Sequence, residues 1–326
     1  MSLIPPELHP VPVPCAAEVG RRLRDRLGAG HLDLPLPGSG HTPRRWEELA
    51  ALGRDDLALA RLAEGHADAV AILAEAGRVA EPGSLYGVWA ARPGGSGAAV
   101  VDGTLRGTVR FCSGAHIVDR ALVVADTSAG RVLVDVAIEP PVARPDPDSW
   151  NTPAMAAADT LDVWFDRLPI DADGVVGEPD WYLTRPGFAI GGGGVAAVWW
   201  GGAAGLLDRA VAHLPDTPDA HQLAHLGELD ALLAAADALL GRVASRIDTR
   251  PSGDHALEVA RARCAVERVV RETLDRVPRM LGAGPLSGDA DLARTLADLG
   301  IYVRQHHGER DHAALGTAVL GARCPS

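Results

Sequence analysis

The spacing of apolar residues changes twice along this 326-residue chain, and the order of those changes most constrains the fold. From about residue 42 to residue 80, leucine, valine and isoleucine recur at helical intervals. Short valine- and leucine-rich runs separated by glycine, proline and aspartate follow, as in β-strands joined by turns. From about Pro186 the helical spacing returns. The chain is therefore expected to form helices, then strands, then helices.

These changes predict three domains, with boundaries at residues 1–82, 83–182 and 183–326. Six or seven short strands over about a hundred residues favour an antiparallel β sandwich or barrel over a parallel sheet. Within this region, Val101-Asp102-Gly103 is a candidate hairpin turn. The predicted fold class is thus α+β multidomain: an N-terminal helical segment, a central antiparallel sandwich or barrel, and a C-terminal helical bundle.

Residues with strong helix-end preferences divide the helical parts further. Thr42 before Pro43 is expected to be an N-cap followed by proline at the first helical position. Asp289 is a second plausible N-cap. The C-terminal bundle is expected to contain helices at 194–214, 218–249, 253–281 and from Asp289 to about Leu315.

Residues 187–207 run for 21 positions without a charge, which is long enough to cross a membrane. The segment is rich in glycine and has no flanking excess of basic residues. A helix buried on all sides by other helices has the same composition. We therefore expect a buried helix and no membrane span.

The overall charge and the cysteines exclude several classes of protein. The formal net charge is −12 and the arginines are scattered, whereas nucleic-acid binding needs a basic face. The four cysteines, Cys15, Cys112, Cys264 and Cys324, show no CxxC spacing, so no metal site is expected. Isolated thiols and the lack of a signal peptide favour a cytoplasmic protein.

Titratable groups concentrate near the C-terminus, in the segment RQHHGERD (residues 304–311). It contains adjacent imidazoles, His306 and His307, followed by Glu309 and Asp311. Imidazole titrates near neutral pH and so suits proton transfer. A helix end that carries His and Arg because of the helix dipole would look the same. Both interpretations stay open at this point.

Four segments together resemble the acyl-CoA dehydrogenase family of flavoproteins, including its flavin monooxygenase-like branch. They are GTVRFCSGAHIVDRALVVA (107–125), DSWNTPAMAAADTLDVWFDRLPI (148–170), GGGGVAAVWWGGAAGLLDRAV (191–211) and RMLGAGPL (279–286). The resemblance covers most of the chain and is best from residue 100 onward. It implies that the chain is a divergent and shortened member of the family. It implies the same helix–sheet–helix order, FAD between the β domain and the bundle, and a homodimer or homotetramer.

The resemblance assigns a flavin-facing role to one strand. Phe111 would take the aromatic place beside the isoalloxazine, next to Cys112, and Ser113 would supply the hydroxyl near flavin N5. An aromatic wall shields the ring, and a neutral donor stabilises charge on reduced flavin. Thr160 stands at a matching family position, and Trp89 lies in the segment that replaces another flavin-binding motif. An ordinary strand with a Ser-Gly turn is the alternative.

The segment RMLGAGPL is similar to the family's glycine-rich turn, which contacts FAD across the subunit interface. Arg279 replaces a glutamine, and an arginine there suits a pyrophosphate. Gly282 would let the backbone approach the phosphates. The alternative is a plain helix C-cap at Gly282 or Gly284.

Counted from that turn, His306 falls on the position of the family's catalytic glutamate. The resemblance therefore implies an FAD-dependent oxidoreductase that desaturates an acyl-thioester-like small molecule, with His306 as the base and His307 and Glu309 nearby. A flavin-dependent oxygenase or oxidase is the first alternative. A degenerate, non-catalytic binding protein is the second, because the family's Arg-x-x-Phe-Gly loop is missing and the N-terminal helical domain is short.

Overall fold

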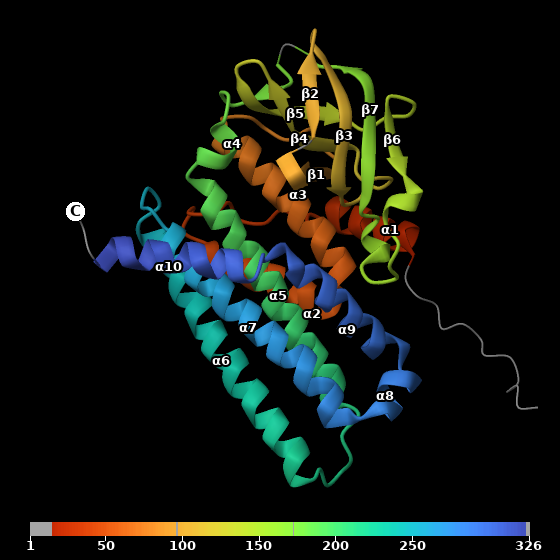
Figure 1. Ribbon diagram of the computed structural model, residues 1–326, viewed down its shortest axis with the longest axis vertical. Helices are drawn as coiled ribbons and strands as arrows, with labels where there is room; N and C mark the ends of the chain where they lie inside the picture. Colours follow the sequence, from red (N-terminus) through yellow and green to blue (C-terminus); the bar gives the residue numbers. More distant parts are fainter. Residues whose placement is uncertain (1–14, 96, 172, 324–326) are drawn as a thin grey trace, which may run out of the picture.

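The computed structural model describes residues 15–323 except Ser96 and Ala172, so the outermost parts of the two predicted terminal domains lie outside it. The chain folds in the predicted order of helices, sheet and helical bundle (Figure 1). The helices are α1 (Ala16–Gly28), α2 (Thr42–Asp55), α3 (Leu57–Glu75), α4 (Trp181–Thr184), α5 (Gly187–Val211), α6 (Ala220–Thr249), α7 (Ala256–Leu281), α8 (Ala283–Gly288), α9 (Ala290–Tyr302) and α10 (Glu309–Arg323).

The predicted helical stretch 42–80 forms two helices, α2 and α3, which meet at Asp56. The Asp56 side chain caps α3 by accepting hydrogen bonds from the backbone N–H groups of Ala58 and Leu59. Thr42 is the first helical residue of α2 instead of its N-cap. Its backbone N–H and its hydroxyl both donate to the carboxylate of Asp248 on α6. A carboxylate distant in sequence therefore holds the start of α2.

Among the described residues, eight strands that fall between the two helical regions in the sequence form one sheet at one end of the molecule (Figure 1). They are β1 (Tyr86–Trp89), β2 (Ala98–Val101), β3 (Thr104–Cys112), β4 (Arg120–Thr127), β5 (Gly130–Ala137), β6 (Ala143–Asp146), β7 (Leu161–Pro169) and β8 (Val175–Val176). The strand order is β6-β7-β3-β2-β4-β5-β8, with β1 on β4. The β2–β3 hairpin turns at Asp102 and Gly103, both with positive φ, as the Val-Asp-Gly sequence predicts.

The expectation of a purely antiparallel sheet is wrong for two strand pairs. Both β1 and β2 run parallel to β4, whereas the other pairs are antiparallel. The reason is that β4 pairs with β2 and β1 and not with β3, the strand before it in the chain. Because β3 is antiparallel to β2, it ends at the edge of the sheet where β1, β2 and β4 start. A sequence pattern gives strand positions but not the partner across the sheet.

The apolar segment 187–207 lies in α5, which is long and apolar enough to cross a membrane by length and composition. However, 83% of its most apolar window is buried inside the protein. It packs against α2 on one side and α7 on another, and one continuous core joins α1–α3 to α5, α6, α7 and α9. The apolar character of α5 is therefore explained by burial among helices.

The expected last helix from Asp289 to Leu315 is interrupted. Asp289 caps α9 as predicted, but α9 ends at Tyr302, and a short 3-10 turn (Val303–Gln305) leads into an extended His306. Gly308 has a φ of 55°, which breaks the helical path before α10 begins. The break places His306 and His307 between two helices instead of on one.

Candidate functional site

A cavity of about 550 Å³ lies among α3, α4, α5, α7 and α10. Its size falls within the range of small-molecule sites. Most of its wall is apolar, and the polar groups that converge on it are Asp68, Tyr182, Arg185, Arg263, Cys264, His306 and Asp311. An apolar chamber with a few converging polar groups is the usual form of a ligand site.

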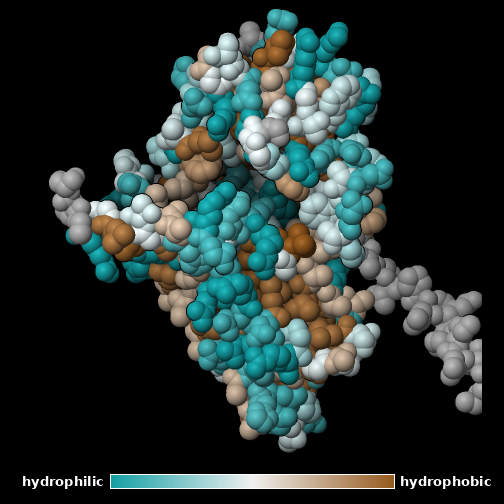
Figure 2. All heavy atoms as spheres, viewed as in Figure 1, coloured by the Kyte–Doolittle hydropathy of each residue, from teal (hydrophilic) through white to brown (hydrophobic). Residues whose placement is uncertain are grey.

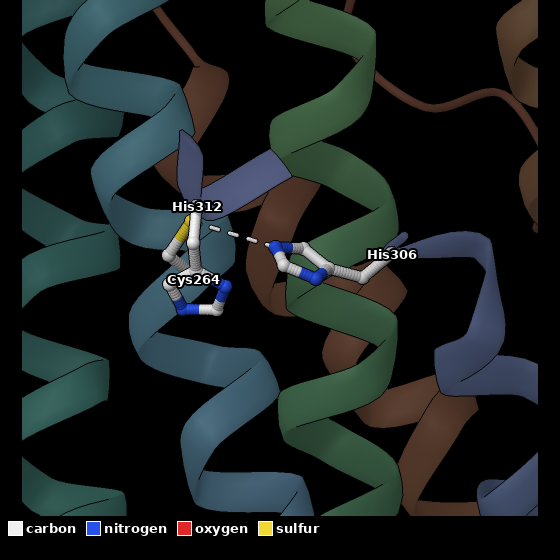
Figure 3. A group of neighbouring side chains, drawn as sticks. All are labelled: Cys264, His306 and His312. Carbon is white, nitrogen blue, oxygen red and sulfur yellow. Dashed lines mark hydrogen bonds between the residues drawn. The ribbon is translucent and has the colours of Figure 1, made fainter. Parts of the chain in front are cut away.

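His306 belongs to this wall, in the break between α9 and α10 (Figure 3). Its imidazole is fully buried, with 0% side-chain exposure, and packs edge-on against Trp199 and His312. Its Nε2 lies 3.4 Å from Cys264 Sγ on α7 and 4.0 Å from a carboxylate oxygen of Asp311 on α10. The ring therefore lies just behind the cavity surface, covered by the first turn of α10.

The hydrogen bonds of His306 fix its tautomer. The backbone N–H of Gly308 donates to Nδ1 at 3.1 Å, so Nδ1 carries no proton. In the neutral ring the proton then lies on Nε2, which donates toward Cys264 Sγ. Burial lowers the pKa of His306, with Asp311 opposing the shift. His306 is thus held as a neutral hydrogen-bond donor.

Cys264, His306 and His312 bring three ligand atoms within 4.8 Å of one another (Figure 3). Such a group could hold a transition-metal ion. However, the His306 nitrogen that faces Cys264 is the protonated one, while burial raises the pKa of the Cys264 thiol. A metal needs both groups deprotonated. The arrangement is therefore better described as a hydrogen-bonded thiol–imidazole pair.

The other two candidate residues of this segment lie outside the cavity. His307 is exposed and lies 3.5 Å from the Asp311 carboxylate. Glu309 is exposed on the first turn of α10. Asp311 is the acid that reaches His306, and it accepts a hydrogen bond from the His307 backbone N–H. Burial alone would raise the pKa of Asp311, but this hydrogen bond and the neighbouring histidines lower it, so its carboxylate stays ionised.

The predicted flavin-facing residues gather at the end of β3. The Ser113 and Thr160 hydroxyls lie 3.0 Å apart, both buried, and Trp89 Nε1 donates to the Ser113 carbonyl oxygen. Cys112 is buried, and burial raises the pKa of its thiol. The structure thus brings Trp89, Cys112, Ser113 and Thr160 together, but the Ser113 hydroxyl already has a protein partner.

Phe111 has a strained backbone and an exposed ring. Its φ is 59°, a left-handed value that is unusual for an aromatic residue, and a bulge in the β3–β7 pairing accompanies it. The bulge directs the ring outward, where 43% of the residue is exposed beside the Arg110 guanidinium. Strain that exposes an aromatic side chain often marks a binding surface. The role of Phe111 beside a flavin stays a prediction.

Arg279 and Gly282 lie at the far end of α7 from the cavity. Arg279 is exposed and pairs with Asp275 one turn earlier, and Gly282 ends the helix with a φ of 71°. Along the helix, Arg279 is about 22 Å from Cys264 at 1.5 Å per residue. Within one chain these two residues therefore cannot share a ligand in this cavity, and their expected role across a subunit interface stays a prediction.

Sequence reasoning missed several polar residues of the wall. Asp68 borders the cavity from α3, and burial raises its pKa to about 7 with a further contribution from nearby Glu64, against the effect of Arg45. Arg185, the residue that follows α4, and Arg263 on α7 also border it. Nothing in the sequence distinguishes these residues from other charged residues in helices or at helix ends, so no signal marks them.

The sequence matches no family model and no curated protein. Solved structures match over nearly the whole chain. TdsC from Paenibacillus sp. A11-2, in a complex with FMN and indole, is 19% identical with a TM-score of 0.78, covering 95% of this chain and 97% of that one. KijD3, with FMN and a dTDP-sugar, is 22% identical with a TM-score of 0.73, covering 93% and 94%. The methanesulfinate monooxygenase MsuC from Pseudomonas fluorescens is 16% identical with a TM-score of 0.76, covering 95% and 96%.

These matches confirm the fold: the chain has the acyl-CoA dehydrogenase-like architecture of its structural neighbours. The alignments span nearly the full length of those neighbours, so this chain is not short in comparison with them. At this level of identity the likeness concerns the fold alone.

Proposed function

We propose that this protein is a flavin-dependent oxygenase that acts on a small molecule bound in the cavity beside His306. The observation that carries the proposal is the hydrogen bond from the Gly308 backbone N–H to His306 Nδ1. Removal of an α-proton from an acyl thioester needs a base with a free lone pair. The Nδ1 lone pair accepts the Gly308 N–H and Nε2 carries a proton, so the ring is arranged to donate.

A neutral imidazole donor suits an oxygen atom that gains negative charge during a reaction. The Nε2–H of His306 would supply that hydrogen bond once the α10 turn moves aside, because His312 and Asp311 now cover the ring. No residue of α10 is fully buried. Its displacement would therefore expose little apolar core.

A bound flavin would supply two-electron redox chemistry and reactivity toward oxygen. Phe111 would form one wall for its ring system, with the paired hydroxyls of Ser113 and Thr160 behind. The structural neighbours with FMN favour FMN over the FAD implied by the sequence resemblance. Figure 2 shows the surface hollowed between the strands and the helical part.

Flavin uptake and oxygen use test this proposal directly. Titration of the purified protein with FMN, FAD and riboflavin, followed by fluorescence quenching, is expected to give the tightest binding for FMN. Supplied with enzymatically reduced FMN, the protein should then consume oxygen faster in the presence of a substrate. Absence of any flavin binding would instead favour the non-catalytic binding protein.

The His306 role is tested by two substitutions. His306→Ala should lower turnover by about 10²-fold, as removal of one preorganised donor does, while flavin stays bound. His306→Gln, which keeps an N–H donor, should retain part of the activity. Anaerobic bleaching of bound flavin by acyl-CoAs would favour the dehydrogenase, the second candidate function implied by the position of His306.

A further inference from the structure

Arg263 is the one arginine of the cavity wall that has no carboxylate within ion-pair distance in the described part of the chain. It is half-buried on α7. Its Nη1 donates to the Gly192 carbonyl oxygen at 2.7 Å, and its guanidinium carbon lies 4.8 Å from the centre of the Trp199 ring. These two contacts hold the group at the cavity surface without neutralising it.

Three other buried or half-buried arginines of this region are paired. Arg45 lies 3.3 Å from Asp68, Arg61 lies 2.6 Å from Glu64, and Arg185 lies 2.6 Å from Glu75. Burying a cation is costly unless an anion compensates for the lost hydration. Burial lowers the pKa of Arg263, the direction expected for a cation whose compensation is incomplete.

Asp311 is the acid with the strongest electrostatic effect on Arg263, but it is beyond ion-pair distance. Its carboxylate already interacts with the His307 backbone N–H at 3.1 Å and with the His307 ring at 3.5 Å. Arg263 has five N–H groups, and only the one to Gly192 has a protein acceptor among residues 15–323 as described. The others are available to a ligand.

The rest of the chamber is suited to an apolar body. The larger apolar side chains that line it are Ile72, Phe188, Val195, Leu257, Val259 and Leu315. A molecule that satisfied both parts of the wall would have an apolar body and one anionic group.

We propose that this cavity binds a small organic acid, with its anionic group paired to Arg263 and its apolar body against these side chains. A guanidinium binds a carboxylate or phosphate through two parallel hydrogen bonds, so Arg263 would fix the orientation of the ligand as well as its charge. The claim that this acid is the substrate rests on the proposed function. The claim that the cavity binds the acid does not depend on that function.

Direct binding of a matched pair of probes tests the inference. Isothermal titration of the flavin-free protein would use 2-naphthoate and its neutral counterpart 2-naphthamide. The acid is expected to bind at least about tenfold tighter than the amide, as for a charge-assisted pair. Equal affinities for acid and amide would overturn the proposal.

Substitution of Arg263 tests whether this residue causes the preference for the acid over the amide. In Arg263→Met the acid should bind no better than the amide, while affinity for the amide is unchanged. Arg263→Lys should keep part of the preference, and it also serves if the Met variant fails to fold. Arg261→Met removes an exposed arginine two residues earlier on the same helix and should leave both affinities unchanged. Full acid preference in Arg263→Met would contradict the assignment.

The phosphate of a flavin is the other source of an anion at Arg263. Titration of wild type and Arg263→Met with FMN and riboflavin separates the two. If the substitution removes the advantage of FMN over riboflavin, Arg263 binds the flavin phosphate and the substrate inference is wrong. If neither protein binds flavin but the wild type still binds 2-naphthoate more tightly than 2-naphthamide, the proposed oxygenase function is wrong. The proposed acid-binding site is supported in that case.

Discussion

Helix α5 carries glycines on two faces, and the atoms that these glycines meet differ between the faces. On the face toward α2, a Cβ on Gly201 would lie 2.0 Å from the Ala50 carbonyl oxygen, and one on Gly205 would lie 2.4 Å from that of Arg54. On the face toward the cavity, a Cβ on Gly191 or Gly192 would meet only side chains, at 3.3 to 3.5 Å.

The difference lies in what can move. Backbone carbonyls of α2 are fixed by helical hydrogen bonds, so the α2 face tolerates no side chain, and glycine there sets the distance between two helices. The cavity face meets Asp68 and Arg263, whose side chains can shift. One face therefore determines stability, and the other determines what the cavity can bind.

The largest effect is expected for Gly201→Ala. Its methyl group would overlap the α2 backbone, so α2 and α5 must separate, at a cost of about 3 kcal/mol or more. Urea unfolding followed by circular dichroism measures the loss. Gly241→Ala is the control, because nothing lies within 4 Å of a Cβ at that exposed position of α6. It should stabilise the protein by about 0.5–1 kcal/mol, and a similar loss in both variants would remove the distinction between the faces.

Asp248→Ala tests how the start of α2 is held against the bundle. The substitution removes the acceptor for the Thr42 N–H, the Thr42 hydroxyl and the Gly40 N–H. A loss of about 1–2 kcal/mol in the free energy of unfolding is expected, as for a helix cap. Thermal unfolding measures it, with Asp248→Asn retaining part of the stability. An unchanged midpoint in the Ala variant would show that α2 needs no such anchor.

Gly192→Ala tests the cavity face. The added Cβ would lie 3.3 Å from Arg263 Nη1, which can shift, so stability should change by less than about 1 kcal/mol. Affinity for 2-naphthoate should fall several-fold, because Arg263 is displaced from the Gly192 carbonyl oxygen that positions it. Isothermal titration calorimetry measures the affinities for 2-naphthoate and 2-naphthamide. A loss in the free energy of unfolding as large as that of Gly201→Ala would contradict the difference between the two faces.

The smallest effect concerns pH and His306. Burial lowers its folded-state pKa below the ordinary value of about 6.5, so the unfolded chain binds the proton more readily. This part of the stability is present above pH about 6.5 and decreases as the pH falls below it. His306→Asn should lack this decrease.

The His306 contribution must be measured as a difference between variant and wild type across pH 5 to pH 8. The pKa of His66 is also lowered by burial, and Asp68, with a pKa raised to about 7, makes stability fall as pH rises toward that value. Both remain in the variant and cancel in the difference. Parallel curves for the two proteins would mean that His306 has no shifted pKa.

The sequence alone determined the order of elements. Periodicity located the two helical regions, although α5 begins at Gly187 instead of residue 194 and the last expected helix is broken after Tyr302. Turn residues such as Asp102-Gly103 located the strands of the hairpin. These signals are local, because a helix or a tight turn depends on neighbouring residues. The short strands β6 and β8 were missed: Pro145 makes β6 read as a loop, and β8 has only two residues.

Spacing along the sequence also led to His306, but only the tertiary structure decided what its surroundings allow. The break at Gly308 sets the tautomer, α7 brings Cys264 and Arg263 to the same wall, and α3 contributes Asp68. Charge compensation depends on distances between residues far apart in the chain. The sequence could therefore identify an imidazole near a helix end, whereas its donor state and the unpaired arginine beside it arise only when the helices pack.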